Sequence, residues 1–207
     1  MGNRNRRKLR RGFYARPTLT VAKELLGKAL VDERIAIRRA VRIVEVEAYV
    51  GEDDPACHAA PGLTERNRVM YGPPGHAYIY LIYGMYHCLN VVTERKGFPA
   101  AILIRAAEPL EGRLEKNSRT GQPQQTDGPG KLCRALNLSL RLNGLDLTGS
   151  QLYLVDRGDC PVQIAASPRI GISSGQDKLW RFYDPTSPWV SNARKRTNAA
   201  QRASGNC

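Results

Sequence analysis

The order of hydrophobic and polar residues along the chain predicts mostly strands, together with two helices. Apolar residues at helical spacing predict one helix over residues 19–26 and another from Pro129 to about Leu138, because proline is favoured in a first helical turn. Alternating or β-branched runs bounded by turn residues predict strands at residues 41–50, 78–82, 86–92, 100–106, 151–155 and 162–166. The polar stretch 115–127 is expected to form a loop.

This pattern predicts the fold class and the domain organisation. Strands outnumber helices, and strands 78–82 and 86–92 flank a tight turn at Gly84. We therefore expect a mixed α/β (α+β) fold, with a curved, mainly antiparallel sheet, flanking helices and a protruding β-hairpin. Residues 13–191 are expected to form a single domain. Residues 1–12 are expected to be a basic disordered tail and residues 192–207 a polar basic tail.

Charge narrows the classes of partner. The chain has 207 residues, 42% of them hydrophobic, and its 32 Lys and Arg against 19 Asp and Glu give a formal net charge of +13. Such a surplus attracts polyanions, so nucleic acid is favoured over the alternative of a basic protein without a polyanionic partner. No apolar run reaches the roughly 18 residues of a membrane span. The five cysteines lie far apart, which favours free thiols in a reducing compartment and argues against a zinc site.

The strand over residues 41–50 carries two carboxylates at alternate positions. Strict alternation places four side chains on one apolar face: Val44, Val46, Ala48 and Val50. The opposite face then carries Ile43, Glu45, Glu47 and Tyr49. Two carboxylates and a phenol on one face fit the floor of a polar cleft. A solvent-exposed sheet face is an equal alternative.

The predicted hairpin is rich in tyrosine. Four of the nine tyrosines fall within residues 78–90, and Tyr83, Met85 and Tyr86 lie at the tip with Tyr80 further down the strand. Aromatic side chains stack on bases, and an apolar tip can wedge between base pairs. The alternative is a cross-strand ladder that only stabilises the sheet. A ladder does not need aromatic residues at the turn itself. Their position at the tip therefore favours a role in contacting DNA.

Two further residues have open alternatives. His58 follows an acidic turn segment and could bind a ligand, bind a metal, or serve as an ordinary hydrogen-bonded side chain. Arg105 ends a predicted strand and could hold a phosphate, or pair with Glu108 or Glu111.

Several sequence blocks together resemble the alkyladenine DNA glycosylase (3-methyladenine DNA glycosylase) family. They are RIVEVEAYVGEDDPACHA, RNRVMYGPPGHAYIYLIYGMYHCLNVV, ILIRAAEPLEG, GPGKLCRALNL, SPRIGI, LWRFY and SPWVS. They follow the family's order and cover roughly residues 13–191. Two departures leave the substrate range and the DNA contacts open: the short segment 173–177, and His87 where the family often has an aromatic residue.

The resemblance implies roles for residues around a base-binding pocket. Glu47 matches the family's general base, which activates the attacking water. Tyr49, His58 and Tyr80 match the side chains that sandwich and hydrogen-bond the extruded base. Asn90 matches the residue that obstructs the exocyclic amine of normal guanine.

The resemblance also implies contacts with the DNA. Tyr83 matches the side chain that enters the minor groove and fills the vacated place in the stack, and Met85 and Tyr86 flank it in the groove. Arg105 matches a residue that holds the phosphate of the flipped nucleotide.

The expected activity is therefore that of a monofunctional DNA glycosylase in base excision repair. We expect it to excise alkylated or deaminated purines (3-methyladenine, 7-methylguanine, hypoxanthine and ethenoadenine) from damaged double-stranded DNA. No lysine stands out as a Schiff-base nucleophile, so hydrolysis without AP lyase activity is expected. We expect a monomer without cofactor or metal, acting on the nucleoid in a bacterial cytoplasm.

Two alternatives remain at this point. A non-catalytic nucleic-acid-binding protein would use the same basic surface and tyrosines, but would leave the carboxylate face unexplained. A metal-dependent nuclease would use oxygen and nitrogen ligands from one stretch of the chain: Glu45, Glu47, Asp53, Asp54 and His58.

Overall fold

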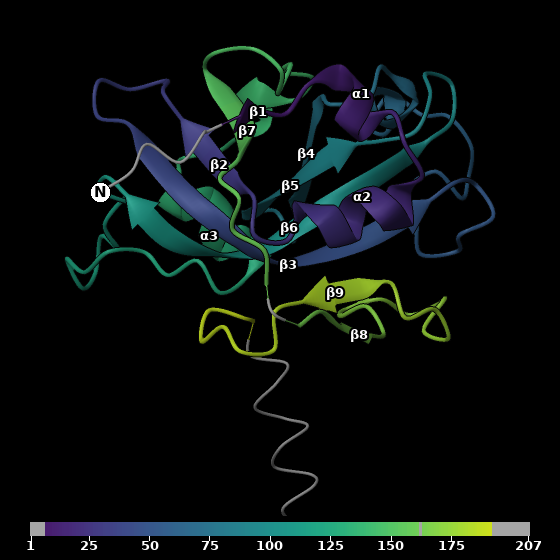
Figure 1. The fold of residues 1–207 in the computed structure, drawn as a ribbon. Helices are drawn as coiled ribbons and strands as arrows, with labels where there is room; N and C mark the ends of the chain where they lie inside the picture. Colours follow the sequence, from purple (N-terminus) through teal and green to yellow (C-terminus); the bar gives the residue numbers. More distant parts are fainter. Residues whose placement is uncertain (1–6, 162, 192–207) are drawn as a thin grey trace, which may run out of the picture.

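The computed structural model of the protein describes residues 7–161 and 163–191. These residues form a nine-stranded sheet, in which the order β1-β7-β2-β3-β6-β5-β4 does not close and β9 pairs with both β3 and β8. Every described pairing is antiparallel. The sheet curves around the core, and β8 and β9 lie beneath it in the view of Figure 1. The predicted fold class is thus confirmed.

The elements have the following bounds. The strands are β1 Arg7–Lys8, β2 Ala29–Asp32, β3 Arg39–Val50, β4 Ala77–Ile82, β5 Tyr86–Val92, β6 Ala100–Glu111, β7 Leu152–Asp156, β8 Ala165–Ser167 and β9 Arg181–Tyr183. The helices are α1 Arg11–Tyr14, α2 Thr18–Leu25 and α3 Pro129–Ala135, with the short 3-10 helices η1 Arg68–Tyr71 and η2 Leu140–Leu142. In the described part of the chain, no helix combines the length and apolar character that crossing a bilayer requires.

The central strand β3 contains an irregularity that the sequence pattern did not predict. Its first half pairs with β2 and residues 45–47 pair with β9, while the register against β6 shifts on both sides of Glu45. Ile43 and Val46 consequently both lie in the main core, whereas Val44 packs with Ala106 and Val190 in a separate cluster. The predicted alternation was therefore wrong for Ile43 and Val44. An extra residue in one strand moves the side chains of the residues before it to the opposite face of the sheet.

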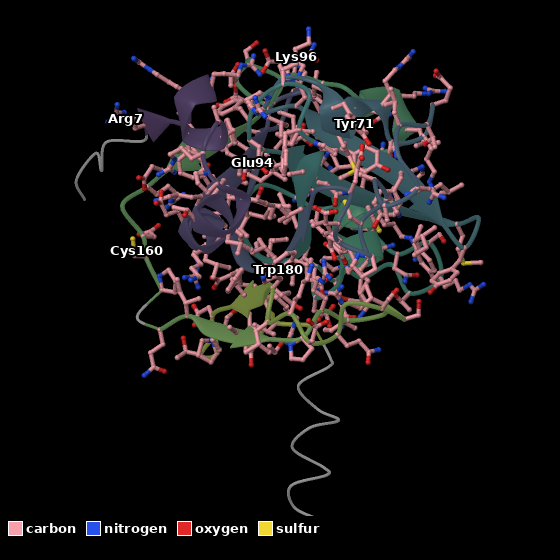
Figure 2. The ribbon with its side chains drawn as sticks, turned by 90° about the vertical axis from the view of Figure 1, so that its right-hand side faces the viewer. Arg7, Tyr71, Glu94, Lys96, Cys160 and Trp180 are labelled. Atoms are coloured by element: carbon pink, nitrogen blue, oxygen red, sulfur yellow. The ribbon has the colours of Figure 1, made fainter. Side chains whose placement is uncertain are left out.

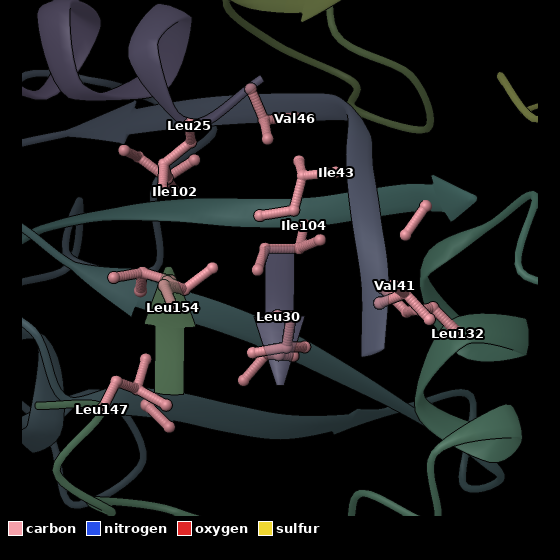
Figure 3. Packing of buried hydrophobic residues seen from close by; sticks show 14 of the residues in the cluster. Leu25, Leu30, Val41, Ile43, Val46, Ile102, Ile104, Leu132, Leu147 and Leu154 are labelled. Carbon is pink, nitrogen blue, oxygen red and sulfur yellow. The ribbon is translucent and has the colours of Figure 1, made fainter. Parts of the chain in front are cut away.

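The main core fills the inside of the curved sheet. Figure 3 shows Leu25 of α2 and Leu132 of α3 together with side chains from the strands, among them Ile102 and Ile104 of β6 and Leu154 of β7. Full burial of each such side chain stabilises the fold by about 1.5–3 kcal/mol. This core holds β3 and β6 side by side, and those two strands carry Glu45, Glu47 and Arg105.

The predicted N-terminal tail was wrong for residues 7–12. Arg7 and Lys8 form β1 against β7, the amide of Leu9 donates to the carbonyl of Leu154, and α1 begins at Arg11. The reason is that Leu9 is buried and that Arg11 pairs with Asp146. Arg7 lies at the edge of the molecule in Figure 2. Residues 1–6 and the predicted tail 192–207 lie outside the described residues.

Candidate active site

A cavity of about 650 Å³ lies between the β4–β5 hairpin, the β3–β6 pair and the loop that follows β8. This volume is within the range of small-molecule sites. Its walls are rich in tyrosine: Tyr49, Tyr78, Tyr80, Tyr83 and Tyr86. Residues 170–174 and 128–131 complete the walls. The cavity thus extends from the floor of the sheet to the tip of the hairpin.

Glu47 lies immediately behind the wall of this cavity. It is fully buried and is not itself one of the lining residues. Its Oε2 accepts hydrogen bonds from the hydroxyl of Tyr49 (2.9 Å) and from Nη1 of Arg105 (3.1 Å), and its Oε1 accepts one from the amide of Ile170 (2.7 Å). All three donor residues line the cavity. The carboxylate is therefore fixed in orientation by the same residues that form the wall.

Glu45 is buried beside Glu47 but belongs to a different set of contacts. Nε of Arg105 and Nε of Arg181 donate to Glu45 at 3.0 and 2.7 Å, and Ser191 donates through both its amide and its hydroxyl. Burial raises the pKa of Glu45, but the charges of Arg105 and Arg181 outweigh this and hold it below its ordinary value. Arg105 thus bridges both carboxylates.

Tyr80 and His58 form one aromatic side of the cavity. Their ring centroids are 4.4 Å apart at an interplanar angle of 70°, and Nδ1 of His58 lies 2.8 Å from the hydroxyl of Tyr78. Burial, and then the charge of Arg66, lower the pKa of His58, so the imidazole is neutral at neutral pH. Burial raises the pKa of Tyr78 to about 12. Tyr78 was not among the predicted site residues.

The cavity floor also contains an amide and two thiols. Nδ2 of Asn90 donates to the carbonyls of Tyr78 and Cys88 at 3.0 and 3.3 Å, which fixes the orientation of the amide. Cys57 and Cys88 line the cavity. Burial raises the pKa of the Cys57 thiol to about 11 and also raises that of Cys88.

The hairpin tip projects two apolar side chains. Tyr83 is 78% exposed and Met85 62% exposed, and the amide of Met85 closes the turn on the carbonyl of Ile82 at 3.2 Å. Tyr83 has a φ of 53° and Gly84 one of 67°. The left-handed region costs a residue with a side chain about 1–2 kcal/mol. Tyr83 thus stands in a strained turn and still reaches the cavity wall.

The structure brings most of the predicted site residues to this cavity. Those that line it are Tyr49, His58, Tyr80, Tyr83, Tyr86, Asn90 and Arg105. Met85 is not among the lining residues and lies beside Tyr83 at the tip. Arg105 is held by Glu45 and Glu47 at the wall.

Sequence reasoning missed the contribution of the loop after β8. The amide of Ile170 reaches Glu47, and Arg169 forms a buried ion pair with Asp54. The SPRIGI block contains both residues, but a backbone amide can donate from almost any residue type. The sequence therefore gives no signal for the bond from Ile170.

The ligand cluster that a metal-dependent nuclease needs does not form. Glu45 is paired with Arg105 and Arg181, and Asp54 with Arg169. Within residues 7–161 and 163–191, no three His, Cys, Asp or Glu side chains are placed to hold one ion. The residues named for the nuclease alternative therefore do not come together as ligands of one ion.

Comparison with known proteins agrees with this geometry. Residues 12–188 match the family model of methylpurine-DNA glycosylase, so the chain belongs to the methylpurine-DNA glycosylase family. It is accordingly a DNA-repair glycosylase for alkylated bases, a hydrolase of N-glycosyl bonds. Damaged DNA is the substrate that the family implies.

Relatives match over most of their length. A protein of Methanocella arvoryzae is 55% identical over 190 residues, covering 88% of this chain and 95% of the relative. One of Alkaliphilus oremlandii is 46% identical over 199 residues (89% and 98%), and one of Sodalis glossinidius is 51% identical over 174 residues (84% and 95%). All three carry the provisional name 3-methyladenine DNA glycosylase.

Proposed function

We propose that the chain is a monofunctional glycosylase that flips an alkylated or deaminated purine into the cavity and uses Glu47 to hydrolyse its bond to the sugar. The substrates are purines of the 3-methyladenine, 7-methylguanine, hypoxanthine and ethenoadenine class in duplex DNA. The observation that carries this proposal is the position of Glu47, hydrogen-bonded to three residues that line an aromatic cavity. The names of the relatives support the alkylated part of the range.

The extruded base is held by the aromatic walls. Flipping costs a few kcal/mol, and less where damage has weakened pairing. Tyr83 and its neighbours Met85 and Tyr86 enter the minor groove and restack the gap, which offsets part of that cost. Tyr49 and Tyr80 offer ring faces to the base, and aromatic faces attract the positive charge of a purine alkylated at N3 or N7.

Hydrolysis then needs one water and one base. Oε1 of Glu47 accepts a single hydrogen bond from Ile170, whereas Oε2 accepts two, so Oε1 keeps acceptor capacity for a water proton. The water oxygen bonds to the anomeric carbon as the glycosidic bond breaks. The purine leaves with the bonding electrons, and Glu47 takes the water proton. An abasic site remains with both strands intact.

The test is release of free 3-methyladenine, 7-methylguanine and hypoxanthine from modified duplexes under single-turnover conditions. Glu47→Gln is expected to lower the release rate by about 10²–10⁴-fold while lesion binding persists, because a general base contributes a factor of this size. Glu65→Gln, which makes the same change at an exposed glutamate, should release bases at the wild-type rate. Wild-type rates from Glu47→Gln would refute the proposed role.

The absence of lyase chemistry needs its own test. Among the described residues, Lys131 is the lysine that lines the cavity, and its ammonium donates to Asp127 at 3.0 Å. Borohydride treatment during turnover is expected to trap no covalent DNA adduct. An adduct that disappears in Lys131→Arg would show Schiff-base chemistry instead.

A further inference from the structure

Arg169 and Asp54 form a fully buried ion pair next to the cavity. Nη1 and Nη2 of Arg169 donate to the two oxygens of Asp54 at 2.5 and 2.8 Å, and both side chains are 0% exposed. The same guanidinium donates to the carbonyls of Ala48 (3.0 Å) and Gly175 (3.3 Å). A planar fork with several donors can make all these bonds at once.

These bonds tie together three segments that surround the site. Ala48 belongs to β3 between Glu47 and Tyr49, Asp54 to the turn after β3, and Gly175 to the loop after β8. That loop carries the amide of Ile170, which donates to Glu47, and residues 170–174 line the cavity. The pair therefore fixes the cavity wall and one hydrogen-bond donor to the carboxylate.

The guanidinium also lies against an aromatic wall. The Arg169 carbon Cζ is 4.8 Å from the ring centroid of Tyr49 and 5.2 Å from that of Trp180, which lies beside β9 in Figure 2. Tyr49 lines the cavity and Arg169 does not, so the guanidinium contacts a cavity-lining ring without itself reaching the cavity.

This position makes the charge of Arg169 matter for the cavity. A bare positive charge against the Tyr49 ring would repel a positively charged base that contacts the same ring, because little water would lie between the two charges. Asp54 supplies the compensating negative charge. Lys178 also approaches Asp54 at 3.8 Å, but its side chain is 27% exposed and solvent screens it.

We propose that Asp54 and Arg169 are a charge-balanced positioning pair, which holds Tyr49 and the Ile170 loop in place and keeps the cavity able to accept a positively charged base. This proposal rests on the proposed function, in that the cavity receives the lesion base. It assigns to the pair a role in lesion preference in addition to its structural role.

The test compares binding of a charged and an uncharged lesion in a Glu47→Gln background, in which slowed excision is expected to preserve both lesions during the measurement. The probes are duplexes with one 7-methylguanine, at a pH that keeps this base cationic, or with one neutral ethenoadenine. Fluorescence anisotropy gives the two Kd values and their ratio. The variants are Asp54→Asn, Arg169→Gln and the double variant, and Asp53→Asn is the matched control because Asp53 is an exposed neighbour.

Asp54→Asn leaves the guanidinium uncompensated, so the Kd ratio of 7-methylguanine to ethenoadenine should rise about tenfold. The double variant removes both charges of the pair. The affinities of this double variant for both lesion duplexes should fall. The ratio of its two Kd values should return to within about twofold of that of the Glu47→Gln background protein. Arg169→Gln leaves the Asp54 carboxylate with only the screened charge of Lys178 nearby and should shift the ratio the other way, which keeps the proposal testable if Asp54→Asn does not fold. Asp53→Asn should leave the ratio unchanged.

An unchanged ratio in the single variants that fold, as judged by circular dichroism, overturns the proposal, because a purely structural pair would weaken both lesions equally. Failure of the proposed function looks different. A background protein that binds neither lesion better than undamaged duplex would refute the function itself.

Discussion

At the scale of single residues, the site depends on groups that are held before any substrate arrives. The three donors to Glu47 come from β3, from β6 and from the loop after β8, and Arg105 is held in addition by Glu45. Donors and acceptors fixed in advance need not reorganise during the reaction, which is how buried polar sites favour a transition state. Small changes at these residues should therefore alter rate more than folding.

His58 gives a prediction for pH. Its pKa lies below the ordinary value of 6.5 because of burial and the charge of Arg66, so the unfolded chain takes up this proton at a higher pH than the folded chain does. The stability that neutral His58 contributes is present above pH 6.5 and is lost as the pH falls below it. His58→Gln should therefore lose less stability on acidification, as measured by urea unfolding at a series of pH values.

The control for this experiment is His87→Gln, the same replacement in β5. It should reproduce the steeper acid dependence of the wild type. If His58→Gln and the wild type lose stability in parallel below pH 6.5, another group accounts for the acid sensitivity.

At the scale of elements, the β4–β5 hairpin combines strain with exposure. Tyr83 adopts a left-handed conformation that asparagine tolerates better than tyrosine. Tyr83→Asn should raise the free energy of unfolding by up to about 1 kcal/mol while lowering base release, because it removes both the strain and the ring. Urea unfolding and single-turnover release measure the two effects.

Met85→Asn is the matched control for the hairpin, since it removes an exposed apolar side chain at the same tip. It should weaken release without the gain in stability. A Tyr83→Asn protein that is less stable than the wild type would show that the turn is relaxed with tyrosine in place.

The sequence predicted the hairpin because its signals are local. Alternation over residues 78–92 and Gly84 specify strands and turn within a few residues. The bulge beside Val44 was missed because extrapolated alternation carries no signal for an inserted residue. β9 was missed because three residues are too short for a period.

Resemblance to a family predicted which side chains gather at the cavity, as with Glu47 behind its wall and the tyrosines that line it. The site was not predictable where the fold alone brings groups together. The partners of the Asp54–Arg169 pair stand 115 positions apart, and Ile170 acts through its backbone. No spacing rule connects such groups before the sheet is assembled.

At the scale of the whole molecule, the net charge of +13 should dominate affinity for DNA. Binding that neutralises about six to ten phosphates loses roughly 10³–10⁵-fold in affinity between about 50 and 200 mM salt. We expect the Kd for lesion duplexes to follow this dependence, measured by anisotropy. The single-turnover rate at saturating enzyme should stay nearly constant, because the chemistry occurs at buried groups. A loss of less than about tenfold would assign affinity mainly to the cavity and the hairpin tip.

The sulfur chemistry of the cavity has a consequence for a protein that works where DNA is being methylated. Reagents that methylate purines also methylate thiols, because the thiolate is a nucleophile that attacks their methyl carbon. Cys57 and Cys88 keep their protons at neutral pH because burial raises the pKa of both. If the cavity receives methylated purines as proposed, its two thiols should react only slowly with the agents that create those purines.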